Sequence, residues 1–238
     1  MTAWVRRVAI RRGVLDIPNA RSSHAVPTPR GGGLGIVAGF LIILAALIYQ
    51  GLFPLLSGLV ILAGTMATAM LGWVDDALRL TATTRLVVQL MIASISVIVL
   101  GGFEHLRVGS SVIDLGWAGS VLAAIGLVWL INLYNFMDGI DGLAGAEAVT
   151  VSLAVSILGA GMYASQIGFS LATLALAAAS AAFVFWNWSP AKVFMGDAGS
   201  AALGFAFGAL ALVSELHQGV PLLVLILLLG LFVVDATL

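Results

Sequence analysis

The chain has 238 residues, of which 61% are hydrophobic and only 9% are charged, and its formal net charge at pH 7 is −1. This composition, with a mean hydropathy of +1.15, excludes an ordinary soluble globular domain and predicts a membrane protein. The sequence contains no cysteine, which excludes disulfides, thiolate metal sites and cysteine nucleophiles.

Residues 1–33 are basic and lack an apolar core, which is the wrong order for a cleavable signal peptide. They predict a cytoplasmic segment on the membrane surface. Its second half is rich in proline and glycine, as a linker would be, but its hydroxyls, His24 and its arginines also suit an anionic ligand. The arginines of the whole segment are Arg6, Arg7, Arg11, Arg12, Arg21 and Arg30.

The rest of the chain, 34–238, predicts one transmembrane domain. Its apolar runs are long enough to cross a hydrocarbon core of about 30 Å one after another. The expected fold is therefore an all-α membrane protein, a polytopic bundle of about eight transmembrane helices with catalytic cytoplasmic loops. The expected spans are 34–50, 55–74, 86–102, 117–134, 148–163, 167–186, 199–214 and 220–235.

The distribution of charge predicts the orientation of this bundle. If the arginine-rich start is cytoplasmic, alternation of the spans places loops 75–85, 135–147 and 187–198 in the cytoplasm as well. Nine of the ten basic residues then lie inside, and only Arg107 lies outside, as the positive-inside rule favours. The same alternation gathers most of the carboxylates at the inner face.

Asp75 and Asp76 follow an apolar run and stand at the end of a predicted helix, where the helix dipole favours cations. A surface ion pair between Asp75 and Arg79, four residues on, would explain one of the two carboxylates. The alternative is that the pair faces a divalent cation and a phosphate, because Mg²⁺ prefers oxygen ligands and shares them with phosphates.

Two further loops carry the same kinds of side chain. The segment from Asn132 to Gly145 contains Asn135, Asp138 and Asp141 among three glycines, which predicts irregular backbone; tight turns alone leave these side chains unexplained. The segment from Asn187 to Ser200 contains Lys192 and Asp197 before the next span. Asp197 could be a helix N-cap, a metal ligand at a phosphate site, or both.

Taken together, these loops resemble the polyprenyl-phosphate N-acetylhexosamine-1-phosphate transferases of glycosyltransferase family 4. The resemblance rests on Asp75-Asp76, Asn132-x-x-Asn135-x-x-Asp138-Gly-x-Asp141-Gly and Pro190-Ala-Lys192-Val-Phe-Met-Gly-Asp197-x-Gly-Ser. The segment Arg21-Ser-Ser-His24-x-x-Pro-Thr-Pro-Arg30-Gly-Gly-Gly resembles the branch that starts bacterial O-antigen, a lipopolysaccharide component, or related surface glycans on undecaprenyl phosphate.

The resemblance implies transfer of a sugar-1-phosphate from a UDP-linked N-acetylated sugar to undecaprenyl phosphate, with release of UMP. It implies Mg²⁺, with Mn²⁺ as an alternative, and a bacterial inner membrane with the active site facing the cytoplasm. Membrane lipid and a second copy of the chain in a homodimer are further expected partners; nucleic acid is not. The resemblance also implies roles for residues: Asp197 and Asn135 as metal ligands, Asp75 and Asp76 as the catalytic pair, and Asp138, Asp141, Asn187, Lys192 and Arg85 in substrate binding.

The chain departs from the family pattern at both ends. Family members carry one more span before the basic segment and continue, after the last predicted span, into a cytoplasmic loop with several histidines. The expectation is therefore a chain truncated at both ends, and one alternative is a non-catalytic remnant of such an enzyme. A transporter fits less well because the predicted span interiors are almost free of charge, and the longer motif of CDP-alcohol phosphatidyltransferases is not found around Asp138.

Overall fold

The computed structural model describes residues 1–18, 26–162 and 167–237, so the predictions for Arg21 and His24 lie outside the described residues. Within these ranges, six helices are long and apolar enough to cross a membrane. The apolar runs form helices because no proline interrupts them and because helix is a backbone state that satisfies its own polar groups in lipid. The six are α3 (Leu55–Leu78), α4 (Ala82–Val99), α5 (Trp117–Met137), α6 (Leu143–Met162), α7 (Ile167–Asn187) and α8 (Asp197–Leu216).

The first and last predicted spans differ from these six. Helix α2 (Leu34–Tyr49) is apolar but has 16 residues, which at 1.5 Å per residue span about 24 Å. The last predicted span is divided at Leu229 into α9 (Leu222–Leu228) and α10 (Gly230–Thr237), each too short to cross a bilayer. Packing explains the break, because α9 contacts α8 whereas α10 turns to α5, where Phe232 lies edge-on to Tyr134 at 5.1 Å.

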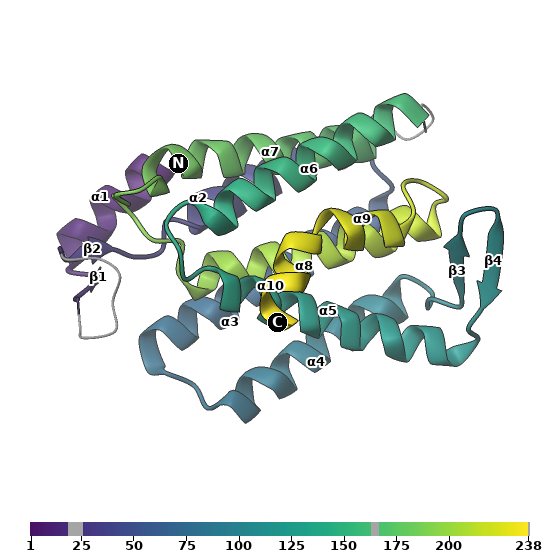
Figure 1. Cartoon of the computed structure of the whole chain (residues 1–238), viewed down its shortest axis with the longest axis horizontal. Helices are drawn as coiled ribbons and strands as arrows, with labels where there is room; N and C mark the ends of the chain where they lie inside the picture. The colour runs from purple at the N-terminus through teal and green to yellow at the C-terminus, as the bar shows by residue number, and fades with distance from the viewer. Residues whose placement is uncertain (19–25, 163–166, 238) are drawn as a thin grey trace.

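Helix α8 is the centre of the bundle, and its residues from Ala198 to Glu215 are buried. It packs against α3, α5 and α2, and Figure 1 shows it enclosed by the other long helices. Small residues permit this contact: Gly64 of α3 faces the ring of Phe205, and Gly204 faces the backbone of α5 at Leu130. Close approach at small residues replaces the hydrophobic driving force that helices lack within lipid.

Shorter elements lie at the two ends of the bundle. The described residues of the basic segment form helix α1 (Thr2–Arg12) and an antiparallel pair of strands, β1 (Leu15–Asp16) and β2 (Thr28–Pro29). The predicted outer loop 103–116 is a β-hairpin instead, made of β3 (His105–Val108) and β4 (Ser111–Asp114). Four cross-strand residue pairs and a glycine with positive φ, Gly109, form this hairpin.

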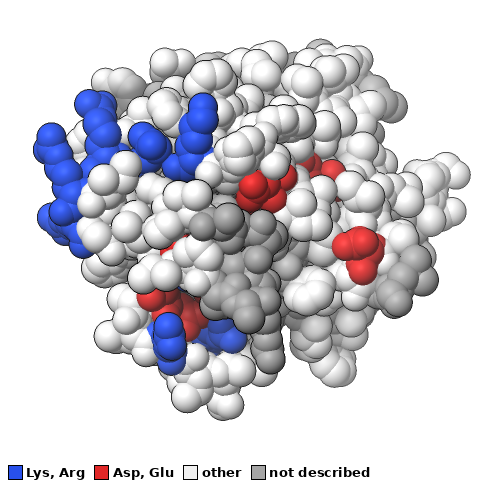
Figure 2. All heavy atoms as spheres, turned by 60° about the vertical axis from the view of Figure 1, so that its left-hand side comes forward, with Lys and Arg blue, Asp and Glu red and all other residues white. Residues whose placement is uncertain are grey.

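The loops that carry the motifs all lie at one end of the bundle. Turns 79–81, 138–142 and 188–196 lie with α1 at the left of Figure 1, whereas the β3–β4 hairpin lies at the right. Figure 2 brings the left end forward and shows basic side chains gathered there. This is the one-sided arrangement that alternation of the predicted spans requires, so four segments distant in sequence can share one site.

Candidate active site

Asp75 is held in the last turn of α3 by two polar contacts. Its Oδ2 accepts from Arg85 Nη1 at 2.7 Å, and its Oδ1 accepts from the Leu80 N–H at 2.8 Å. Arg79, the partner expected from sequence, instead ends the helix in the left-handed region with φ 52°, and only its backbone N–H bonds to the Asp75 carbonyl. Because the Arg79 backbone leaves the helical conformation, its side chain does not take the direction that an i+4 ion pair needs, and Arg85 of the next helix supplies the compensating charge.

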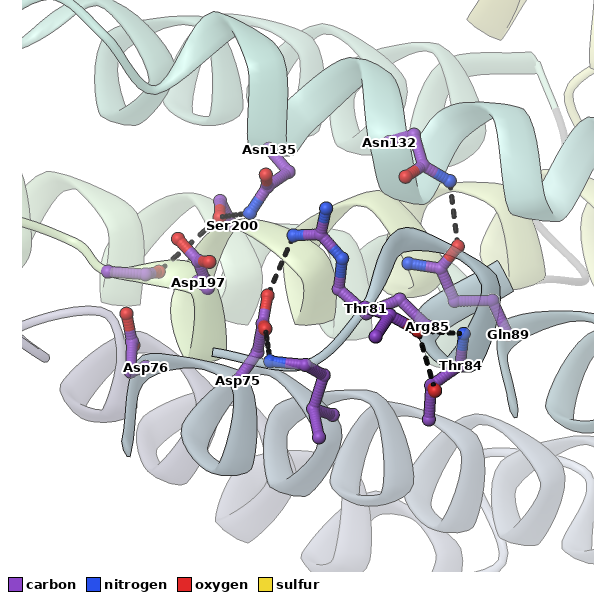
Figure 3. Close-up of polar contacts among 12 residues, drawn as sticks. Asp75, Asp76, Thr81, Thr84, Arg85, Gln89, Asn132, Asn135, Asp197 and Ser200 are labelled. Atoms are coloured by element: carbon purple, nitrogen blue, oxygen red, sulfur yellow. Dashed lines mark hydrogen bonds and ion pairs between the residues drawn. The ribbon is translucent and has the colours of Figure 1, made fainter. Parts of the chain in front are cut away.

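Asp76 points in a different direction from Asp75 and faces the start of α8. Arg30 lies between Asp76 and Asp197: Nη1 is 3.4 Å from Asp76 Oδ1, and Nη2 is 3.5 Å from Asp197 Oδ1. Figure 3 shows Asp75 turned to Arg85 and the Asp197 carboxylate lying between Asp76 and Asp75, so Asp75 is also a neighbour of Asp197. The side chains of adjacent residues in a helix point about 100° apart. Asp75 therefore pairs with Arg85, whereas Asp76 pairs with Arg30.

Asn135 connects the segment 132–145 to the start of α8. Its Nδ2 donates to Ser200 Oγ at 3.1 Å, one turn into α8, and its side chain also contacts the Asp197 carboxylate. The two residues predicted as metal ligands are therefore neighbours. Across the described residues, however, no three His, Asp or Glu side chains are arranged to hold a metal by themselves.

Asp138 belongs with this carboxylate group. Burial raises the pKa of the Asp138 carboxyl well above its usual range; the negative charges of Asp197 and Asp76 act in the same direction, and Arg30 opposes them. Asp76, Asp138 and Asp197 thus lie close enough to affect one another, and Asp75 acts on Asp197 as well, which makes a group of four carboxylates from α3, the α5–α6 turn and α8. Such a concentration of like charge is typical of sites that bind a cation.

Asp141 and Asn187 hold the motif loops together. Asp141 Oδ2 accepts from the Ala191 N–H at 3.0 Å. Asn187 is buried, accepts from the Gly142 N–H at 2.9 Å through Oδ1, and donates to the Val193 carbonyl at 2.9 Å through Nδ2. Both polar atoms of the buried Asn187 are engaged with backbone, so this residue positions the two loops.

An open cavity with a volume of about 1590 Å³ connects this site to the apolar surface. Its polar end contains Arg30, Asp75, Asp76, Arg85 and Asp197, and apolar side chains of α2 and α3 form its wall. The wall includes Leu34, Val37, Met66, Met70 and Trp73. Lys192 is exposed outside this cavity, and its carbonyl accepts from Arg6 Nε at 3.0 Å, so the structure does not bring Lys192 to the carboxylates.

Arg30 is the functional candidate that reasoning from single residues did not select. Its segment is bound to the segment before Asp197 by three backbone hydrogen bonds, from Phe194 to Pro29, from Gly32 to Phe194 and from Gly33 to Met195. These bonds connect residues more than 160 positions apart. The sequence did carry a signal, since the triple glycine after Arg30 permits this approach: a methyl group at Gly33 would overlap Gly199 of α8.

Gly72 fixes the distance between the two helices that carry Asp76 and Asp197. A methyl group there would overlap the backbone of Asp197 and Ala198, which cannot move aside as a side chain can. We expect Gly72→Ala to lower the free energy of unfolding by about 1–3 kcal/mol, the usual effect of overpacking. Thermal unfolding in detergent measures this change.

Gly126→Ala is the matched control, because it also adds one methyl group in the middle of a long helix but meets no atom within 4 Å. Equal unfolding temperatures for the two variants would contradict the close contact between α3 and α8.

Comparison with known proteins places this geometry in a family. Residues 58–215 match the model of the family described as glycosyl transferase family 4. This range runs from the first turn of α3 to the last turn of α8 and contains every predicted site residue.

Individual relatives agree with the family match. The chain is 32% identical, over its whole length, to a probable undecaprenyl-phosphate N-acetylglucosaminyl 1-phosphate transferase of Bacillus subtilis, of which it covers 66%. It is 34% identical, over 87% of its length, to a decaprenyl-phosphate N-acetylglucosaminephosphotransferase of Mycolicibacterium smegmatis, covering 55% of that protein. A phospho-N-acetylmuramoyl-pentapeptide-transferase of Desulforamulus reducens is also 34% identical over 87% of the chain, with 65% of its own length covered.

The chain thus spans slightly less than two thirds of the length of the first and third of these relatives and about half of the length of the second. Its multi-pass helical bundle, its family model and its relatives lead to the same assignment. The chain belongs to glycosyltransferase family 4.

Proposed function

We propose that this protein transfers an N-acetylated sugar-1-phosphate from a UDP-sugar to undecaprenyl phosphate, releasing UMP and starting a lipid-linked surface glycan such as O-antigen. The observation that carries the proposal is the cavity, which has four charged motif side chains and Arg30 at one end and apolar helix surface along its wall. This combination suits a substrate with a phosphate head and a long hydrocarbon chain. The relatives, whose names specify a polyprenyl phosphate and an amino sugar, support the same class of reaction.

The reaction joins two phosphates. An oxygen of the lipid phosphate attacks the phosphorus that bears the sugar, and the bond between the two donor phosphates breaks, so that UMP leaves with the bonding electrons. Both reactants are anionic, and the task of the protein is to position them and offset their charge. Arg85 and Arg30 are the cationic side chains of the cavity that contact the motif carboxylates.

The residues present fit a divalent cation. Asp76 Oδ1 is buried and has no hydrogen-bond donor within the described part of the chain, and it faces Asp197 across the Arg30 side chain. Asp197 and Asn135 would hold Mg²⁺, or Mn²⁺ in its place, with phosphate oxygens completing the set because Mg²⁺ usually shares its ligands with substrate phosphates. The ion would neutralise charge on the phosphates.

Asp75 acts in this proposal as an organiser of Arg85, since both its oxygens already accept hydrogen bonds. The competing hypothesis is a general base. We expect Asp75→Asn to lower UMP release by roughly tenfold through displacement of Arg85, with the loss reduced when Arg85→Gln is already present, because residues that act as a unit are not additive. The rates of the two single variants and the double variant measure this coupling.

A general base would give a different pattern. Asp75→Asn would then abolish turnover with substrate binding intact, and it would do so equally in the presence of Arg85→Gln.

The donor nucleotide is assigned to the turn after α5 and the loop before α8. Asp138 and Asp141 carry carboxylates there, Asn187 orders the backbone, and Lys192 is exposed within the loop. The excess of basic residues at this end of the bundle supports an orientation in which the site faces the cytoplasm, in a bacterial inner membrane. The proposal also includes a homodimer as the assembly.

The test supplies undecaprenyl phosphate, Mg²⁺ and a panel of UDP-N-acetylated sugars to the purified protein and measures UMP. We expect UMP and a lipid-linked diphosphate sugar with one donor of the panel. The assay is run on the 238-residue chain and on any longer product of its reading frame. UMP from neither form, with both folded, would contradict the proposed function and favour a non-catalytic remnant.

A further inference from the structure

Arg30 stands between two carboxylates that come from different helices. Its guanidinium is 3.4 Å from Asp76 Oδ1 and 3.5 Å from Asp197 Oδ1, and no other arginine or lysine in the described ranges has a salt bridge to two acidic residues. We propose that Arg30 holds the place of the divalent cation in the substrate-free protein, and that cation binding displaces its side chain toward the acceptor phosphate. This inference rests on the proposed function.

The two ion pairs of Arg30 are weak enough to exchange. Both nitrogen–oxygen distances exceed the 2.7 Å of the Arg85–Asp75 pair, and the Arg30 side chain is 41% exposed. Partly exposed ion pairs at such distances are among the weak ones, because solvent screens their attraction. Arg85, with its short bond to a buried carboxylate, stays in place, so the site has one fixed arginine and one exchangeable arginine.

The backbone of Arg30 is fixed, so exchange involves the side chain alone. The Arg30 N–H donates to the Val14 carbonyl at 3.2 Å, and Phe194 and Pro29 are joined by a backbone bond of 2.8 Å. The segment therefore keeps its position beside the start of α8 whether or not the guanidinium contacts a carboxylate. A long side chain on a fixed backbone can turn without moving the helices that carry the site.

Repulsion between two carboxylates explains why a cationic group is needed between them when no metal ion is bound. Asp76 and Asp197 face each other in a partly buried setting, and two carboxylates without a cation between them repel. Asp76 Oδ1 is buried and accepts no hydrogen bond in the described part of the molecule. The charge of the Asp76 carboxylate is offset by Arg30 and by the backbone N–H groups of Asp197 and Ala198 at the start of α8, and Arg30 is the cationic side chain among them. A divalent cation would satisfy both carboxylates better, and it would release Arg30 into the cavity that it already lines.

The experiment measures Mn²⁺ binding to the purified, substrate-free protein from the electron paramagnetic resonance signal of free Mn²⁺. Because Arg30 competes with the ion, we expect Arg30→Gln to bind Mn²⁺ roughly three- to tenfold more tightly than the parent protein. Arg30→Lys keeps the charge but cannot bridge two carboxylates as a guanidinium does, so we expect an intermediate value. Thermal unfolding without metal establishes that each variant is folded.

Arg12→Gln is the control, because Arg12 lines the same cavity and the described residues offer it no salt bridge. It removes the same charge from a more exposed position of the same cavity and should leave Mn²⁺ affinity within about twofold. Equal or weaker Mn²⁺ binding by folded Arg30→Gln, an equal gain in Arg12→Gln, or no binding by any of the proteins would each overturn the inference. UMP release by the parent protein is measured in parallel, so failure of the inference alone is distinguished from failure of the proposed function.

Discussion

Asp197→Asn is expected to lower UMP release by roughly 100- to 1000-fold, the loss typical of removing one electrostatic contact to a reacting group. Asp197 begins α8, contacts Asn135, and faces Asp76 across Arg30. Asparagine keeps the size of the side chain but loses the charge that a divalent cation requires. The measurement is the initial rate of UMP release over a range of Mg²⁺ concentrations.

The mechanism predicts more than a loss of rate. If Asp197 is a metal ligand, the remaining activity of Asp197→Asn should need a higher Mg²⁺ concentration, whereas a helix cap would affect stability and leave the Mg²⁺ requirement unchanged. Asp114→Asn, in the β3–β4 hairpin at the opposite end of the bundle, is the control. An Mg²⁺ dependence equal to that of the parent protein would reject Asp197 as a ligand.

The sequence predicted which side chains share an end of the bundle but not which of them touch. Alternation of spans is enough to place Asp76 and Asp197 on one face. Their contact through Arg30 depends on backbone pairing between residues near 29–33 and 194–195, which no local pattern encodes. The same limit explains the error over Arg79: helix spacing predicts an i+4 pair, but the helix ends at Leu78 and the pair forms with Arg85.

The fold, like the site, was predicted only in part from the sequence. Six predicted spans correspond to helices of membrane-crossing length, because a long apolar run has few alternatives in lipid. The break at Leu229 was not predicted, because residues 222–229 and 231–234 are apolar and only Gly230 between them marks the place. Its cause is tertiary, namely the packing of Phe232 against Tyr134. The hairpin at 105–114 was also not predicted, and its position is fixed by a contact with α8 that is distant in sequence.

That contact is a buried ion pair at the end of the bundle opposite the motif loops. Glu215, at the end of α8, is buried and accepts from Arg107 through its backbone N–H at 2.7 Å, through Nε at 3.0 Å and through Nη2 at 3.1 Å. The second carboxylate oxygen also accepts from the Leu222 N–H at 2.7 Å, where α9 begins. One carboxylate thus joins the hairpin, the central helix and the divided last helix.

We therefore expect Arg107→Met to destabilise the protein by about 3–5 kcal/mol, because it leaves a buried carboxylate without its cation. For a chain of this length, the apparent Tm in detergent should fall by roughly 6–20 °C. Arg7→Met is the control, since Arg7 is exposed on α1 and donates only to the nearby Ala3 carbonyl within the described residues. Adding Glu215→Leu to Arg107→Met should recover part of the loss, because apolar side chains at both positions leave no buried charge. If Arg107→Met alone unfolds at the parent temperature, the hairpin is held by its apolar contacts and the ion pair does not determine the position of α9.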